Sequence, residues 1–118
     1  MKLYNIRVFV RDWDTACEFY EHTLKLPLKY KNPQLGWAEF DVGGPSLGIE
    51  RVDNDDREGQ ELVGQFLGIS LQIDDIASTY KHLTDRGVEF TQPPEQQPWG
   101  GRLTHFRDPA GNVLTLLE

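Results

Sequence analysis

Polar and aromatic side chains alternate with apolar ones along two segments of the chain, and they are the first candidates for binding chemistry. In the first segment, Asn5, Arg7 and Phe9 share one face of a predicted strand, and in the second, Ser70 and Gln72 do so. Strict alternation is typical of a strand that buries one face and leaves the other available. The sequence therefore predicts a face of small and polar groups with one guanidinium, suited to holding a small molecule.

Arg7 is the most informative of these residues, because a charge that faces inward is costly unless it is paired. One interpretation is that Glu39 or Glu50 neutralises the guanidinium from across the sheet. The other is that Arg7 stays free for an anionic ligand. Both interpretations remain open on the sequence alone.

Further candidates lie on other predicted strands and on one loop. Trp99 stands between Pro98 and a Gly-Gly pair, so we expect a loop residue that covers a ligand. A few polar groups among aromatic side chains are typical of a small-molecule pocket. The predicted ligand-binding set is Asn5, Arg7, Phe9, Trp37, Glu50, Gln72, Trp99, His105 and Thr115.

No arrangement for covalent or acid–base catalysis is visible. His22 and His82 fall on predicted helices and His105 on a predicted strand, so the histidines do not form a ligand set. Cys17 takes an apolar helical position and is predicted to lie in the core. The sequence has no nucleophile beside a base and no glycine-rich phosphate loop before a helix. We therefore name no catalytic residue.

These residues are positioned by a unit that occurs twice. The pattern x-Φ-x-Φ-x-Φ-x-Asp-Φ, with Φ apolar, begins at Asn5 and again at Gly68, 63 residues later, and apolar residues then recur at helical spacing. We predict one α+β domain over residues 1–118, in which two βαβββ repeats form curved mixed sheets around a concave cavity. The repeats span 1–53 and 66–118, and an acidic linker spans 54–65.

Composition narrows the classes of function. The chain has 118 residues, of which 38% are hydrophobic and 26% charged, and a net charge of −7. An acidic protein lacks the basic footprint that nucleic acids require. No apolar run is long enough to span a membrane, no signal peptide is visible, and Cys17 has no partner for a disulfide. We expect a cytoplasmic protein that binds neither nucleic acid nor membrane.

Three motifs place the chain near a known superfamily. They are Val8-Phe9-Val10-Arg11-Asp12 leading into Phe19-Tyr20, Ile73-Asp74-Asp75-Ile76 leading into Arg86-Gly87-Val88-Glu89-Phe90, and Phe106-Arg107-Asp108-Pro109-Ala110-Gly111-Asn112-Val113-Leu114. With these motifs the chain resembles the vicinal-oxygen-chelate superfamily over nearly its whole length. That superfamily includes glyoxalase I, extradiol dioxygenases, fosfomycin-resistance proteins and bleomycin-resistance proteins.

The resemblance implies one metal ligand on each of four strands. The corresponding positions are Asn5, Gly48, Gly68 and Thr115, which lack the imidazole and carboxylate donors that a divalent ion requires. We therefore predict no metal and no cofactor, and on this ground we favour a protein that is not an enzyme. The resemblance then favours the bleomycin-resistance members, which sequester a small molecule in a cavity between two subunits.

The leading hypothesis is thus a metal-independent small-molecule-binding protein that forms a homodimer. One alternative is a metal-dependent lyase, isomerase or dioxygenase that uses displaced ligands such as Glu50 and His105. The second alternative is a dimeric scaffold that holds no ligand.

Overall fold

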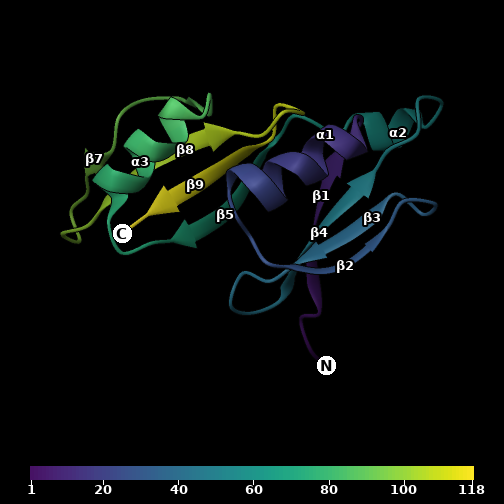
Figure 1. The fold of residues 1–118 in the computed structure, drawn as a ribbon, viewed down its shortest axis with the longest axis horizontal. Helices are drawn as coiled ribbons and strands as arrows, with labels where there is room; N and C mark the ends of the chain where they lie inside the picture. Colours follow the sequence, from purple (N-terminus) through teal and green to yellow (C-terminus); the bar gives the residue numbers. More distant parts are fainter.

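The computed structural model describes residues 1–118, and two βαβββ modules lie side by side along its longest axis (Figure 1). The first module consists of β1 (Asn5–Val10), α1 (Trp13–Glu18), the π-helical turn η1 (Phe19–Thr23), β2 (Leu28–Asn32), β3 (Trp37–Phe40) and β4 (Ser46–Arg51). The second consists of β5 (Phe66–Gln72), α3 (Ile76–Asp85), β6 (Glu89–Phe90), β7 (Glu95–Gln96), β8 (Arg102–Arg107) and β9 (Val113–Leu117). The short helix α2 (Arg57–Gln60) lies in the acidic segment between them.

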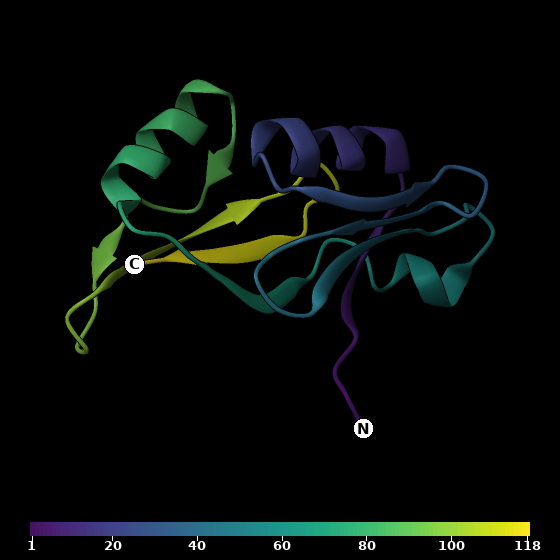
Figure 2. The ribbon, with the colours of Figure 1, turned by 60° about the horizontal axis from the view of Figure 1, so that its bottom comes forward.

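Each module builds one mixed sheet. Sheet A has the strand order β1-β4-β3-β2, and sheet B has the order β5-β9-β8-β6, with β7 paired to β8. The pairs β1–β4 and β5–β9 are parallel and the other pairs are antiparallel. In Figure 2, α1 and α3 cover the same side of the two sheets. The opposite faces, called helix-free below, are adjoined only by the short helix α2, beside Arg7, Phe9 and Glu50 of sheet A. The predicted α+β class with two βαβββ repeats is confirmed, and the second repeat carries one further short strand, β7, that pairs with β8.

Local signals in the sequence account for the helices. The Asp12 side chain accepts a hydrogen bond from the Thr15 N–H at 3.1 Å and caps α1, and Asp75 caps α3 in the same way. Gly87 has φ of 88° directly after α3, a left-handed conformation that glycine adopts without strain. The duplicated Asp therefore acts as a helix start in both modules.

The core lies between the sheets and their helices. Val8 and Val10 of β1 are fully buried on this side, as the alternation predicts. Phe19 of η1 packs against Phe106 of β8, so the aromatic core continues across both modules. Cys17 is buried, and desolvation raises the pKa of its thiol to about 11, so it remains an unreactive thiol.

Some elements differ from the expectations. The helical spacing after Asp12 predicts one continuous helix, whereas the structure has a π-helical turn, η1, after Glu18. The N-terminal end of the chain extends away from the body of the molecule (Figure 2), whereas Tyr4 is hydrogen-bonded to Ser46 and Glu39 of sheet A. None of the helices has the length and apolar content needed to cross a bilayer.

Candidate functional site

The helix-free face of sheet A carries aromatic and charged side chains in two rows. In one row Phe9, Glu50 and Trp37 lie opposite one another on β1, β4 and β3. In the neighbouring row, Arg7 of β1 and Glu39 of β3 lie on either side of Gly48 of β4. Because alternate residues of a strand share a face, both rows project to the side away from α1.

Arg7 is paired within its own sheet. Its Nη1 lies 3.2 Å from Oε1 of Glu50, and its guanidinium lies 5.3 Å from the centre of the Phe9 ring. The two charged side chains are 55% and 33% exposed, so this ion pair contributes at most about 1 kcal/mol. The structure agrees with the interpretation in which Arg7 is paired within the protein. A ligand could displace Glu50 from Arg7 at small cost.

Glu39 is the most enclosed charge on this face, with only 9% of the residue exposed. Its Oε2 accepts a hydrogen bond from the Trp37 indole N–H at 3.0 Å, and its Oε1 accepts one from the Tyr4 hydroxyl at 3.1 Å. These hydrogen bonds, chiefly that from Trp37, hold the pKa of Glu39 below its usual value, whereas the carboxylate raises the pKa of Tyr4. The ionised carboxylate therefore fixes both aromatic side chains.

The Trp37 indole uses space that only a glycine leaves open. A Cβ atom built on Gly48 would lie 2.2 Å from Cη2 of Trp37, which no real side chain tolerates. Gly48 has no left-handed φ, so the requirement for glycine here is steric and not conformational. Gly48 and Trp37 are thus mutually dependent.

The helix-free face of sheet B is more mixed. Nδ1 of His105 lies 2.8 Å from Oγ1 of Thr115, and the Phe66 ring packs edge-on against the imidazole at 5.4 Å between centres. Gln72 lies exposed on β5. Trp99, which is 61% exposed, lies in the loop between β7 and β8.

The predicted site residues therefore form two groups. Asn5, Arg7, Phe9, Trp37 and Glu50 lie on sheet A, and Gln72, Trp99, His105 and Thr115 lie on sheet B or its loop. No hydrogen bond, ion pair or aromatic contact joins a side chain of one group to a side chain of the other.

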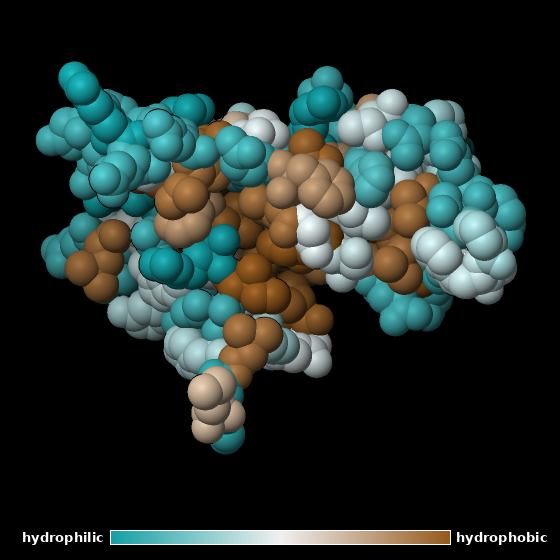
Figure 3. All heavy atoms as spheres, turned by 180° about the vertical axis from the view of Figure 1, so that it is seen from behind, coloured by the Kyte–Doolittle hydropathy of each residue, from teal (hydrophilic) through white to brown (hydrophobic).

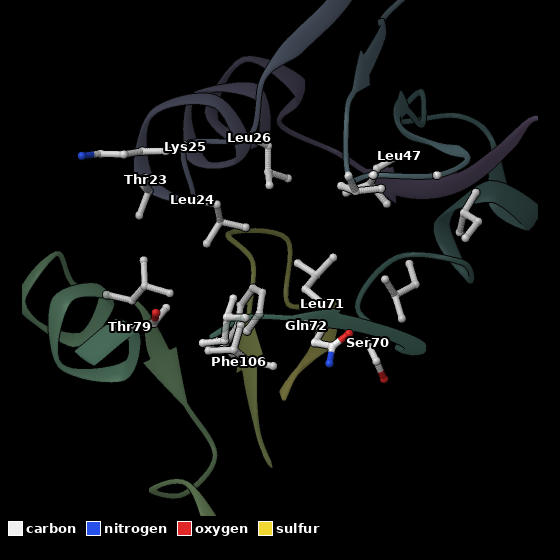
Figure 4. A pocket seen from close by; sticks show the side chains of 18 of the residues that line it. Thr23, Leu24, Lys25, Leu26, Leu47, Ser70, Leu71, Gln72, Thr79 and Phe106 are labelled. Carbon is white, nitrogen blue, oxygen red and sulfur yellow. The ribbon is translucent and has the colours of Figure 1, made fainter. Parts of the chain in front are cut away.

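A cavity of about 840 Å³ lies between the two modules. Figure 3 shows it as an apolar hollow between the two lobes of the molecule, and Figure 4 shows Leu24, Leu71 and Phe106 around it. Of the predicted ligand-binding residues, only Gln72 lines this cavity. A second pocket of about 270 Å³ adjoins Arg7, Phe9 and Glu50, and α2 forms one of its walls.

The residues at the four positions that the resemblance marks for a metal do not fit an ion. Asn5 and Thr115 offer neutral oxygens, Gly48 and Gly68 offer no side chain, and Thr115 already contacts His105. The Trp37 indole moreover fills the space above Gly48 where a ligand side chain would project. No group of three or more His, Cys, Asp or Glu residues is arranged to hold an ion anywhere in the chain.

Two residues that contribute to the sheet A face, Glu39 and Tyr4, are absent from the ligand-binding set predicted from the sequence. Glu39 had a visible signal, because it lies two residues after Trp37 and so shares its face. Tyr4 had none, since it shares the parity of Ile6 and alternation assigns it to the helix side. Its hydroxyl nevertheless donates to Glu39, from a position just before the first residue of β1.

Paired βαβββ modules that leave one face of each sheet open define the glyoxalase-fold class of proteins. The chain belongs to the Glyoxalase/Bleomycin resistance protein/Dioxygenase superfamily, whose sequence model matches residues 2–116.

Three relatives illustrate this membership. A crystal structure of a superfamily member from Sphaerobacter thermophilus DSM 20745 is 34% identical, with a TM-score of 0.82 over 100% of this chain and 97% of that one. A bleomycin resistance protein of Klebsiella pneumoniae is 27% identical over 92% of this chain and 85% of its own length. TnmS3, an antibiotic binding protein from Streptomyces sp. CB03234, is 29% identical, with a TM-score of 0.76 over 98% of this chain and 93% of that one.

Proposed function

We propose that the protein binds a small organic molecule on its helix-free sheet faces without a metal ion. The observation that carries this proposal is the Trp37 indole above Gly48, which puts an aromatic ring where a metal-dependent relative needs a ligand side chain. The remaining positions, Asn5, Gly68 and Thr115, lack strong donors as well. Lewis-acid chemistry at this site therefore has no support from the side chains present.

The relatives support binding as the shared property. One is a bleomycin resistance protein and another is an antibiotic binding protein, and both align along most of this chain. A mixture of aromatic rings with few polar groups, as on sheet A, is the usual lining of a small-molecule site. These points favour sequestration over turnover.

The complete site requires a second copy of the chain. The sheet A and sheet B groups make no mutual side-chain contact within one chain, so each presents an open half-site. In a two-fold dimer, sheet A of one copy would face sheet B of the other and enclose the ligand twice. The single buried Cys17 fits a reducing compartment such as the cytoplasm.

Thermal unfolding of purified protein tests this function. We expect at least one member of a panel of glycopeptide and aromatic antibiotics, bleomycin included, to raise the Tm in the presence of EDTA, because ligand binding stabilises the folded state. The variant Thr115→Val should weaken the shift, and Lys81→Ala, an exposed change on α3, should preserve it. A shift that EDTA abolishes and a divalent ion restores would favour the metal-dependent alternative. No shift with any compound would favour the scaffold.

A further inference from the structure

We propose that the hollow between the two modules is a second binding site, which takes the hydrocarbon chain of a free aliphatic monocarboxylate. Its volume of about 840 Å³ falls within the usual range of small-molecule sites, about 300–1,000 Å³. Of the predicted ligand-binding residues only Gln72 lines it, so this site is distinct from the sheet A surface. The proposal therefore adds a ligand class that the function proposed above does not include.

The apolar wall of the hollow has a fully buried counterpart in the first repeat. Leu71 and Ile73 occupy the places that Val8 and Val10 hold in the duplicated pattern. Val8 and Val10 are fully buried, whereas Leu71 and Ile73 are only partly buried and line the hollow. Leu and Ile side chains exposed to water gain free energy when an apolar group covers them. The second repeat therefore leaves a hydrocarbon-binding surface on β5.

The rest of the apolar lining is almost entirely aliphatic. Leu24 and Leu26 follow the start of η1 in the chain, Leu83 belongs to α3, and all three line the hollow (Figure 4). Phe106 of β8 is the one aromatic residue of the lining, and it is fully buried, so its ring has little surface left for stacking. A flexible chain of methylene groups suits such a wall, because burial of apolar area requires no particular orientation.

The ionisable side chains that line the hollow are all basic. The protein has 19 Asp and Glu residues and a net charge of −7, yet none of these carboxylates lines the hollow, whereas Lys25 and His82 do. An apolar site with basic groups and no acidic ones favours a ligand that carries a negative charge. A single charge is favoured over several, because the net charge of the protein opposes each further one.

Polar groups gather at one end of the hollow. Thr23, Lys25 and Thr79 lie together on one side of the apolar side chains (Figure 4). Arg86, directly after α3, donates to the carbonyls of His22 and Thr23 at 3.0 and 3.4 Å, so it connects α3 to the end of η1 and adds a positive charge there. Ammonium and hydroxyl groups are donors for a carboxylate. A carboxylate held at this end would leave its hydrocarbon chain along the wall.

NMR of isoleucine δ1-methyl groups tests the site directly, because the five isoleucines fall into two sets. Ile6, Ile69 and Ile73 line the hollow, whereas Ile49 and Ile76 are fully buried outside it. We expect sodium decanoate to shift the methyl resonances of Ile69 and Ile73 saturably. The resonances of Ile49 and Ile76 should stay in place.

Chain length and head group separate the burial of hydrocarbon from the recognition of charge. From dodecanoate to decanoate to octanoate, the loss of each pair of methylene groups should weaken binding about tenfold. Decyltrimethylammonium has the same chain as decanoate but a positive charge. It should bind about tenfold more weakly than decanoate, because the lining has two basic groups and no acidic one.

Variants assign the two parts of the site. Lys25→Met keeps the stem of the side chain and removes its charge, so it should weaken decanoate binding about fivefold. Lys2→Met, the same change outside the hollow, should have no effect. Ile69→Ser removes apolar wall and should weaken decanoate and decyltrimethylammonium alike. Lys25 is exposed, so its comparison with Lys2 decides the role of charge even where Ile69→Ser does not fold.

Equal binding of decanoate and decyltrimethylammonium would overturn the proposal, and so would unmoved Ile69 and Ile73 resonances. If these two resonances shift with protein concentration and not with decanoate, a second chain fills the hollow and the proposal is wrong. The effect of antibiotics on the Tm tests the sheet A surface and is independent of each of these results.

Discussion

Among single residues, Glu39 connects two aromatic side chains of the sheet A face. It is the most buried carboxylate of the sheet A face and accepts hydrogen bonds from residues on either side of it, Trp37 and Tyr4. A buried charge is tolerated only when its oxygens are hydrogen-bonded, and both oxygens of Glu39 are. Its ionisation state therefore matters for the position of two aromatic side chains.

Replacing Glu39 by Gln should make the free energy of unfolding depend less on pH in the acidic range. The pKa of Glu39 is lowered in the folded protein, so its contribution is fully present above the usual pKa of 4.5 and is lost as the pH falls through the folded value. Urea unfolding between about pH 3 and 6 should show a smaller pH dependence for Glu39→Gln than for the wild type. Trp37→Phe, which removes the principal hydrogen bond, should give an intermediate slope. Parallel curves for all three proteins would contradict this role.

At the scale of elements, the turn between β8 and β9 joins the modules. The Tyr20 hydroxyl of η1 donates to Oδ2 of Asp108 at 2.8 Å, and burial raises the pKa of this phenol well above its usual value. Asn112 donates to the carbonyl of Phe9 on β1 and accepts from the N–H groups of Gly64 and Gln65. The Asp-Pro-x-Gly-Asn segment thus positions sheet B against β1 and the linking segment.

Truncation of Asn112 should be strongly destabilising. Asn112→Ala leaves two backbone N–H groups and a carbonyl without their partner, which costs about 3 kcal/mol or more of unfolding free energy. Chemical denaturation monitored by circular dichroism measures this loss. Asn54→Ala, an exposed change without such contacts, should remain within about 0.5 kcal/mol of the wild type. An equally small effect of Asn112→Ala would show that the turn does not hold the modules together.

For the whole molecule, the important feature is the direction of the two open sheet faces. Both lie on the side away from α1 and α3, next to each other and not opposed (Figure 2). A ligand on one chain is therefore covered from one side only. The apolar hollow between the modules adds an uncovered surface of Leu and Ile side chains, which a second chain could bury.

Mixing two inactive variants distinguishes a shared site from a site within one chain. Trp37→Ala damages sheet A and His105→Ala damages sheet B, so each variant dimer should lose ligand binding. After unfolding and joint refolding, half of the dimers are mixed and each holds one intact site of two, which restores about a quarter of the wild-type sites. Isothermal titration with a ligand found by thermal shift counts these sites. No recovery, with mixed dimers shown by mass spectrometry, would place the complete site within a single chain.

The local features of this protein were determined by its sequence. Alternation placed Val8 and Val10 in the core, and Asp75 and Gly87 marked the ends of α3, because these signals act between residues close in the chain. Alternation also assigned Asn5, Arg7 and Phe9 to one face of their strand, and Ser70 and Gln72 to one face of theirs. The duplicated pattern was sufficient for the fold class.

Only the tertiary structure decided which of these groups meet. The pairing of Arg7 with Glu50, the carboxylate shared by Tyr4 and Trp37, and the indole above Gly48 depend on the register of β1, β4 and β3. Register is set by packing and hydrogen bonds between residues far apart in the chain, which local patterns do not encode. For the same reason the sequence could not show that the two open faces lie beside each other with an apolar hollow between their modules.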